Sequence, residues 1–170
     1  MITKPRLEER TEQHYVGIRT EVPMKALRKA IPQLHGEVFA FLDKQGVDPA
    51  GAPFVHYHII DMEALLDVEM GVPVASPVSG DGRVSAGVLP AGRYAALVYT
   101  GAGNGIKGNK ALLDWGVEQG LVWDRYASDR GDGFGTRIES YLTDPADEPN
   151  PAKWETEVAI RLADEQPRYE

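Results

Sequence analysis

Two similar stretches decide the fold of this chain: Val55-His56-Tyr57-His58-Ile59-Ile60-Asp61 and Ile138-Glu139-Ser140-Tyr141-Leu142-Thr143-Asp144. Each is rich in aromatic and β-branched residues and ends at an aspartate, which is typical of a strand followed by a turn. The second stretch begins 83 residues after the first (138 minus 55). This offset indicates that the chain contains two copies of one structural unit.

The other predicted elements recur in the same order around these strands. The first half has strands at 15–19, 54–60 and 65–72 and a helix at 32–45, and the second half has strands at 84–89, 94–100, 136–143 and 156–162 and a helix at 109–119. We therefore predict an α+β fold of tandem strand–helix–strand–strand units with both helices on the outside. A single domain is expected over residues 1–170, with internal repeats at 1–75 and 83–163.

Both helices are predicted from apolar side chains at helical spacing. The first is expected to begin at Pro32, because proline suits a first turn and disrupts a helix interior, and to end at Gly46. The second carries an apolar arc that comprises Leu112, Leu113, Trp115 and Val117. Leu112 and Trp115 are therefore expected in the core.

Composition excludes several classes of protein. The chain has 18 basic and 26 acidic residues, a formal charge of −8, and no cysteine. A negative chain without a basic cluster is not expected to bind nucleic acid directly, and the missing cysteines exclude disulfides and thiolate chemistry. No stretch resembles a signal peptide or a transmembrane helix, so we expect a cytoplasmic protein that does not enter membranes.

A glycine-rich segment, Gly103-Asn104-Gly105-Ile106-Lys107-Gly108, matches the spacing of a dinucleotide-binding loop. It follows a strand and precedes a helix, as such a loop requires. However, no parallel strand–helix–strand unit follows, and glycine is frequent in this chain. We interpret the segment as a strand-to-helix connection and predict no cofactor.

The triplet His56-Tyr57-His58 places two imidazoles on one face of a strand. A metal site needs at least a third ligand, and the spacing does not select Asp61 or Glu63 for that role. We therefore interpret the histidines as residues that line a pocket or the surface, and we predict no metal.

Period-two alternation divides the strand at 136–143 into two faces. Arg137, Glu139 and Tyr141 share one face, and the other, with Ile138 and Leu142, is expected to pack against a helix. The first face is either a solvated surface or a carboxylate at the base of an aromatic pocket. A carboxylate held among apolar and aromatic groups attracts cations, because burial leaves its charge without compensation.

Three segments of the second half resemble the GyrI-like effector-binding domains, which occur alone or as ligand-binding parts of AraC-type and MerR-type regulators. These segments are Lys110 to Leu121, Ile138-Glu139-Ser140-Tyr141-Leu142-Thr143-Asp144-Pro145 and Thr156-Glu157-Val158-Ala159-Ile160. The likeness extends from Pro5 to Leu162. It implies antiparallel sheets that form a ligand cleft, in agreement with the repeat.

The resemblance also implies site residues. In the family a glutamate on the penultimate strand contacts cationic ligands, and it corresponds to Glu139, with Tyr141 also lining the cleft. From the strand pattern we add Tyr57, Tyr99 and His56 as pocket residues, and Trp154 as a lid. Asn109 stands where relatives often carry an aromatic residue.

The expected function is therefore that of a stand-alone protein that binds hydrophobic amines or lipophilic cations, for sensing or sequestration. A second hypothesis is hydrolysis of strained electrophilic toxins, with Glu139 as general base. A third is a protein partner, as for a gyrase inhibitor. Haem binding is the weakest hypothesis, since its only possible axial ligands are His14, His35, His56 and His58.

Overall fold

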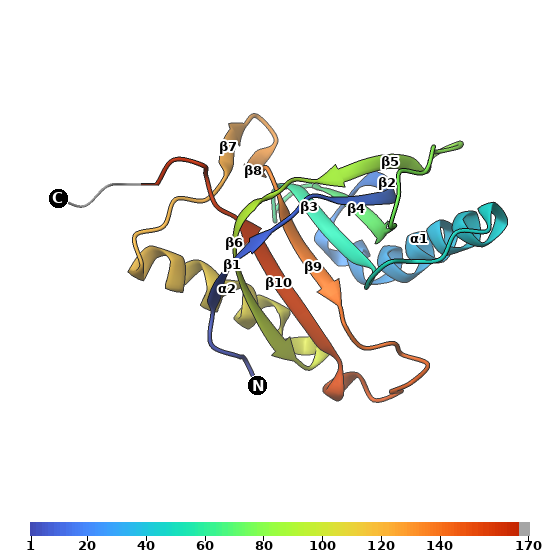
Figure 1. The fold of residues 1–170 in the computed structure, drawn as a ribbon. Helices are drawn as coiled ribbons and strands as arrows, with labels where there is room; N and C mark the ends of the chain where they lie inside the picture. The colour runs from blue at the N-terminus through green and yellow to red at the C-terminus, as the bar shows by residue number, and fades with distance from the viewer. Residues whose placement is uncertain (167–170) are drawn as a thin grey trace.

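The fold is known from a computed structural model that describes residues 1–166 (Figure 1). Its helices are α1 (Met24–Gln45) and α2 (Gly105–Glu118), with short 3₁₀ turns η1 (Ala102–Asn104) and η2 (Pro151–Lys153). Its strands are β1 (Arg6–Arg10), β2 (Gln13–Val22), β3 (Phe54–Ile60), β4 (Leu66–Pro73), β5 (Ser85–Leu89), β6 (Gly92–Thr100), β7 (Arg125–Ser128), β8 (Gly131–Phe134), β9 (Arg137–Tyr141) and β10 (Glu155–Arg161). The order agrees with the sequence prediction, except that β1 and the β7–β8 hairpin were not expected.

The strands form one antiparallel sheet in which the same pairing occurs twice. In the first half β4 lies between β2 and β3, and in the second half β10 lies between β6 and β9. The halves join where β3 pairs with β9, and the main path of the sheet is β1-β6-β10-β9-β3-β4-β2-β5. The predicted α+β class of tandem strand–helix–strand–strand units is confirmed. The exact repeat boundaries, 1–75 and 83–163, stay a prediction.

Helix α1 begins earlier than the sequence prediction. It starts at Met24, so Pro32 lies inside it, and the predicted start at Pro32 was wrong. The apolar face explains the extra turns, because Leu27 is buried on the same side as Leu34. The predicted end is confirmed by Gly46, which takes a left-handed conformation (φ 68°) that glycine adopts without strain.

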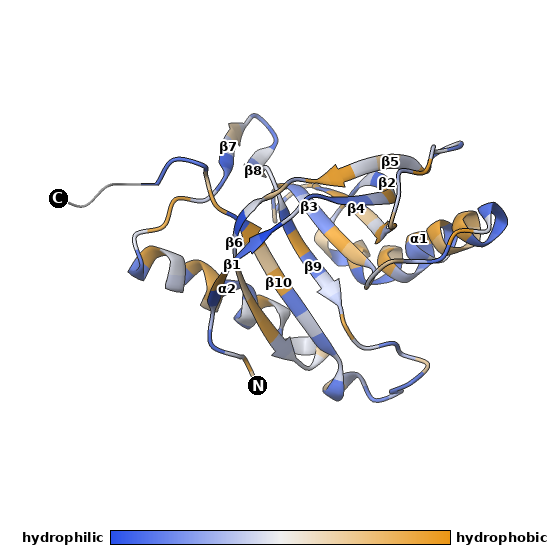
Figure 2. Cartoon of the chain, in the orientation of Figure 1, coloured by the Kyte–Doolittle hydropathy of each residue, from blue (hydrophilic) through white to orange (hydrophobic). Residues whose placement is uncertain are grey.

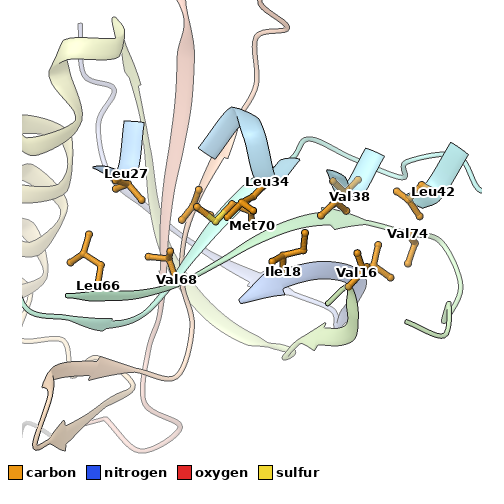
Figure 3. Packing of buried hydrophobic residues seen from close by; sticks show 13 residues of the cluster. Val16, Ile18, Leu27, Leu34, Val38, Leu42, Leu66, Val68, Met70 and Val74 are labelled. Carbon is orange, nitrogen blue, oxygen red and sulfur yellow. The ribbon is translucent and has the colours of Figure 1, made fainter. Parts of the chain in front are cut away.

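The core of the first half lies between α1 and the strands β2 and β4. Figure 3 shows the apolar side chains of α1 facing those of the strands. The fully or almost fully buried members include Val16, Ile18, Leu27, Leu34, Val38, Leu42, Leu66, Val68, Met70 and Val74. Burial of a side chain of this kind contributes roughly 1.5–3 kcal/mol, so this layer fixes the position of α1 on the sheet.

Helix α2 also differs from its prediction. It begins at Gly105 instead of residue 109, and its buried face is formed by Gly108, Leu112 and Gly116, which are four residues apart. Leu112 is fully buried as predicted, but Trp115 is only half-buried and Val117 is 76% exposed. The predicted arc was too wide, since Val117 points about 140° away from Leu112 at 100° per residue.

The two helices pack on the sheet face that carries Glu139. Val55 pairs with Glu139, and both Val55 and Tyr141 belong to the core layer that contains α1. Ile138 instead packs with Phe54, Tyr94 and other residues that include no helix side chain. The expectation that Ile138 and Leu142 face a helix was therefore wrong: Leu142 is 49% exposed. Figure 2 shows the alternation of hydrophobic and hydrophilic residues along the central strands.

Neither helix of the described residues is long and apolar enough to cross a membrane.

Candidate functional site

Glu139 lies near the centre of the sheet, on β9, and its side chain is almost entirely buried. The residue is 9% exposed. The hydroxyl of Tyr99 on β6 donates a hydrogen bond to Oε2 of Glu139 over 3.1 Å. The side-chain amide of Asn109 on α2 donates to Oε1 over 3.0 Å. Two elements that lie far from β9 in the sequence therefore hold the carboxylate.

Sheet register brings three tyrosines to the same side as Glu139. Thr156 of β10 pairs with Tyr99 on one side and with Tyr141 on the other, so these side chains form a row across three strands. Tyr57 lies two residues beyond Val55, the partner of Glu139, and points to the same face. The predicted group of Glu139, Tyr57, Tyr99 and Tyr141 is thus brought together.

The glycine-rich segment before α2 has a structural role at this site. A Cβ atom on Gly108 would lie 2.6 Å from Cδ1 of Tyr99, so only glycine allows the ring to pack against the helix. That packing places the Tyr99 hydroxyl beside Glu139 and Asn109. The glycine spacing therefore reflects contact between a helix and an aromatic ring.

Arg137 is the charged residue nearest in sequence on the same face of β9. Its Nη2 donates to Oδ1 of Asn109 over 3.0 Å, and its guanidinium lies 4.7 Å from the centre of the Phe134 ring. Within the described residues, Glu139 has no cationic group within 4.0 Å. Asn109 therefore connects the two charges without a direct ion pair.

The burial of this group affects its protonation. Loss of hydration raises the pKa of Glu139 above its ordinary value, while hydrogen bonds from Asn109 and Tyr99 and the charge of Arg137 oppose that increase. Burial and the nearby Glu139 charge raise the pKa of Tyr57 and of Tyr141 well above the usual range. The tyrosines are therefore neutral hydroxyl groups around a carboxyl group that is costly to ionise.

Two other predicted residues lie apart from this group. His56 pairs with Ile138, so its side chain points to the opposite face of the sheet from Glu139. Trp154 precedes β10, and its Nε1 donates to the carbonyl oxygen of Glu148. Its role as a lid stays a prediction. Sequence reasoning missed Asn109 as a partner of Glu139, although its departure from the family pattern was a signal.

Two surface cavities lie elsewhere on the described part of the chain, with volumes of about 520 Å³ and 240 Å³. The larger is lined by Ile60, Asp61, Met62, Ala127, Ser128, Gly131 and Asp132, and the smaller by His14, Tyr15, Pro77, Val78, Ala86, Gly87 and Val88. None of the predicted ligand-binding residues lines either cavity.

Comparison with protein families matches residues 3–163 to the GyrI-like small molecule binding domain. Curated proteins gave no match. Among solved structures, the C-terminal domain of EcmrR is similar over 94% of this chain and 97% of that domain, with a TM-score of 0.76 and 20% identity. In the complex of EcmrR with DNA, the TM-score is 0.75 at 22% identity over 94% of this chain, which spans 57% of the EcmrR chain.

A further similar structure is SAV2435 bound to tetraphenylphosphonium, with a TM-score of 0.63 and 11% identity over 95% of each chain. A hydrolase from Listeria innocua has a TM-score of 0.62 and 15% identity over 94% of this chain and 92% of that one. At these identities the likeness shows a common fold.

Proposed function

The chain belongs to the family of GyrI-like small molecule binding domains, and we propose that it binds hydrophobic amines and lipophilic cations at Glu139. In this proposal the carboxylate is the electrostatic anchor, and Tyr57, Tyr99 and Tyr141 supply aromatic surface. The protein senses or sequesters its ligand in the cytoplasm, either alone or by signalling to a protein partner. We do not expect the chain to contact nucleic acid directly.

One observation carries this proposal: Glu139 is buried and has no ion-pair partner within 4.0 Å among residues 1–166. A buried carboxylate is costly unless a cation compensates its charge. A bound organic cation supplies that charge and also replaces contacts among the tyrosines. Each favourable contact between a cation and an aromatic face adds roughly 0.5–2 kcal/mol.

The structure of SAV2435 with tetraphenylphosphonium supports the choice of ligand class, since a protein of this fold was solved with a lipophilic cation. The EcmrR structures support a role in sensing, because the similar region is the C-terminal domain of a protein that was solved on DNA. In this chain Arg137 lies beside the proposed site, bonded to Asn109, and its charge opposes a cation. The proposal therefore favours cations with large apolar surfaces over small hydrated ones.

Ligand entry requires movement of side chains. Glu139 is 9% exposed, whereas Tyr57 and Tyr141 are half-buried and pack against the core layer that contains α1. A ligand as large as tetraphenylphosphonium reaches the carboxylate only when these rings change position. Binding should accordingly alter tyrosine fluorescence and protect the β9 backbone from hydrogen exchange.

The proposal is tested by calorimetric titration of the full chain with tetraphenylphosphonium and with triphenylphosphine oxide, a neutral aromatic analogue. We expect saturable binding of the cation at one site per chain and weaker binding of the neutral compound. Equal affinity for both compounds, or no binding of either, would contradict a site anchored by charge.

A second candidate function is hydrolysis of strained electrophiles. Burial raises the pKa of Glu139, which suits a general base, and one similar structure is described as a hydrolase. In this reaction Glu139 accepts a proton from water while the water oxygen attacks the electrophilic carbon. The strained carbon–heteroatom bond breaks, its electron pair passes to the heteroatom, and protonated Glu139 returns the proton to that atom. Chromatographic detection of ring-opened product tests this function. If this function is correct, the variant Glu139→Gln should still bind the strained electrophile but no longer hydrolyse it.

A further inference from the structure

A second cluster of polar side chains lies on the opposite face of the sheet, where β3 and β4 are adjacent. His56 pairs with Glu69, and His58 follows at a shift in register between Tyr57 and Ile59. The rings of His56 and His58 have centroids 3.8 Å apart, and Nε2 of His58 lies 2.9 Å from Oε1 of Glu69. One potential ligand atom from each of the three residues lies within 4.8 Å of the other two.

His56 is the member of this cluster that the fold does not explain. It is 5% exposed, and neither of its ring nitrogens makes a well-formed hydrogen bond in residues 1–166, since the nearby backbone of Gly135 offers only a contact outside good hydrogen-bond geometry. A buried polar group without a partner costs about 1–3 kcal/mol, and native proteins rarely leave one so unless an ion or water completes it.

We propose that His56, His58 and Glu69 form a binding site for a divalent transition metal ion of the zinc type. Two imidazole nitrogens and one carboxylate oxygen are a donor set that binds zinc with a fourth position open to water. Imidazole donors favour such ions over magnesium and calcium, which prefer sites built from oxygen. The third ligand comes from β4, a strand that the spacing of the histidines does not reveal.

The surroundings of the cluster suit a cation. The hydroxyl of Tyr15 donates to Oε1 of Glu69 over 2.8 Å, and such outer contacts orient the carboxylate that binds a metal. Arg19 is a positive group that acts on this cluster, but its guanidinium forms two 2.9 Å hydrogen bonds with Asp67. Arg130 also lies 3.4 Å from Asp67 and pairs with Glu21 over 3.2 Å, so these two arginines and two acids neutralise one another and the negative charge of Glu69 remains.

The site can be reached and is independent of the proposed function. The side chains of His58 and Glu69 are 14% and 9% exposed, so an ion can enter from solvent. His56 pairs with Ile138 on one face of the sheet, whereas Val55 pairs with Glu139 on the other. Loss of cation binding at Glu139 would leave this proposal unchanged.

The proposal is tested with the tag-free full chain after treatment with a chelator. We expect calorimetry to show one zinc ion bound per chain, and Co²⁺ to give the visible absorption bands of a site with nitrogen and oxygen ligands. His58→Gln and Glu69→Gln should each weaken zinc binding by about 100-fold or more, since loss of outer contacts alone costs about 10- to 100-fold. His14→Gln, a histidine outside the cluster, is the matched control and should bind as the parent does.

A further variant separates a metal ligand from a structural residue. His56→Leu removes the nitrogens but keeps an apolar side chain, so the metal-free variant should melt at the same temperature as the parent or higher, and zinc should no longer raise its melting temperature. Absence of saturable zinc and cobalt binding by the folded parent would overturn the proposal. Unchanged binding by the folded His58→Gln and Glu69→Gln variants would overturn it as well.

Discussion

The side-chain amide of Asn109 donates a hydrogen bond of 3.0 Å to Oε1 of Glu139, and its oxygen accepts one of 3.0 Å from Arg137. A helix residue thus separates a buried carboxylate from the cation nearest to it on the strand. Because the two charges do not pair directly, the carboxylate can compensate the charge of a ligand. This arrangement links the fold of the second half to the proposed binding of cations.

Asn109→Ala should raise the pKa of Glu139 further, since a hydrogen bond to a charged group contributes about 1.5–3 kcal/mol. Cation affinity in this variant should reach its plateau at a higher pH than in the parent. Titrations with tetraphenylphosphonium over a series of pH values measure this difference. Superimposable pH profiles would show that Asn109 does not support the ionised carboxylate.

Because the pKa of Glu139 is raised, cation affinity and the stability of the free protein should depend on pH in opposite directions. Cation affinity should fall as the pH is lowered through that pKa, because the protonated carboxyl group has no charge. The free protein should gain stability over the same interval, since its folded state binds the proton more tightly than the unfolded state, whose pKa is about 4.3. This gain is lost as the pH rises through the folded pKa.

Denaturation of the parent and of Glu139→Gln at several pH values isolates this contribution. The difference in unfolding free energy should favour the variant more at neutral pH than at pH 5. A difference that does not change with pH would contradict the assigned burial of the carboxylate.

Gly108→Ala should destabilise the fold by about 1–3 kcal/mol, because the added methyl group overlaps the Tyr99 ring. Displacement of that ring should also weaken cation binding. Gly103→Ala is the matched control, since a Cβ atom there meets no atom within 4 Å among the described residues. Thermal denaturation and calorimetry of both variants check the effect, and equal behaviour of the two would refute the contact.

Leu112→Ala should lower the free energy of unfolding by about 2–5 kcal/mol, as expected for removal of a fully buried leucine. Val117→Ala, on the exposed side of the same helix, should change it by less than about 0.5 kcal/mol. Urea denaturation measures both values. A larger effect at Val117 would mean that the face of α2 is assigned incorrectly.

The spacing of residues along the sequence predicted most of the helices and strands but not all of their boundaries. The charged strand β1 was missed because its charges are stabilised by distant partners, with Arg6 and Arg10 both bonded to Glu157 of β10. The start of α1 was misplaced because Pro32 was assigned to a first turn. Burial of Leu27 against the sheet keeps the earlier turns helical despite that proline.

Period-two alternation and family resemblance together predicted Glu139 and Tyr141 as site residues, and their role in binding stays a prediction. They could not identify Asn109, because its contact joins a helix to a strand 30 residues away. Nor could they assign a face to His56 and Tyr57, which are neighbours and must point in opposite directions. That choice depends on the register of β3 against β9, where Val55 meets Glu139.

The most direct test of the central claim compares the parent with Glu139→Gln in calorimetric titrations with tetraphenylphosphonium at neutral pH. The substitution keeps the shape of the side chain and removes its charge. We predict a loss of about 2–3 kcal/mol, or roughly 30- to 150-fold in affinity. Glu118→Gln, which removes the same charge at an exposed position of α2, should bind as the parent does. Equal affinity of the parent and a folded Glu139→Gln variant would contradict the account.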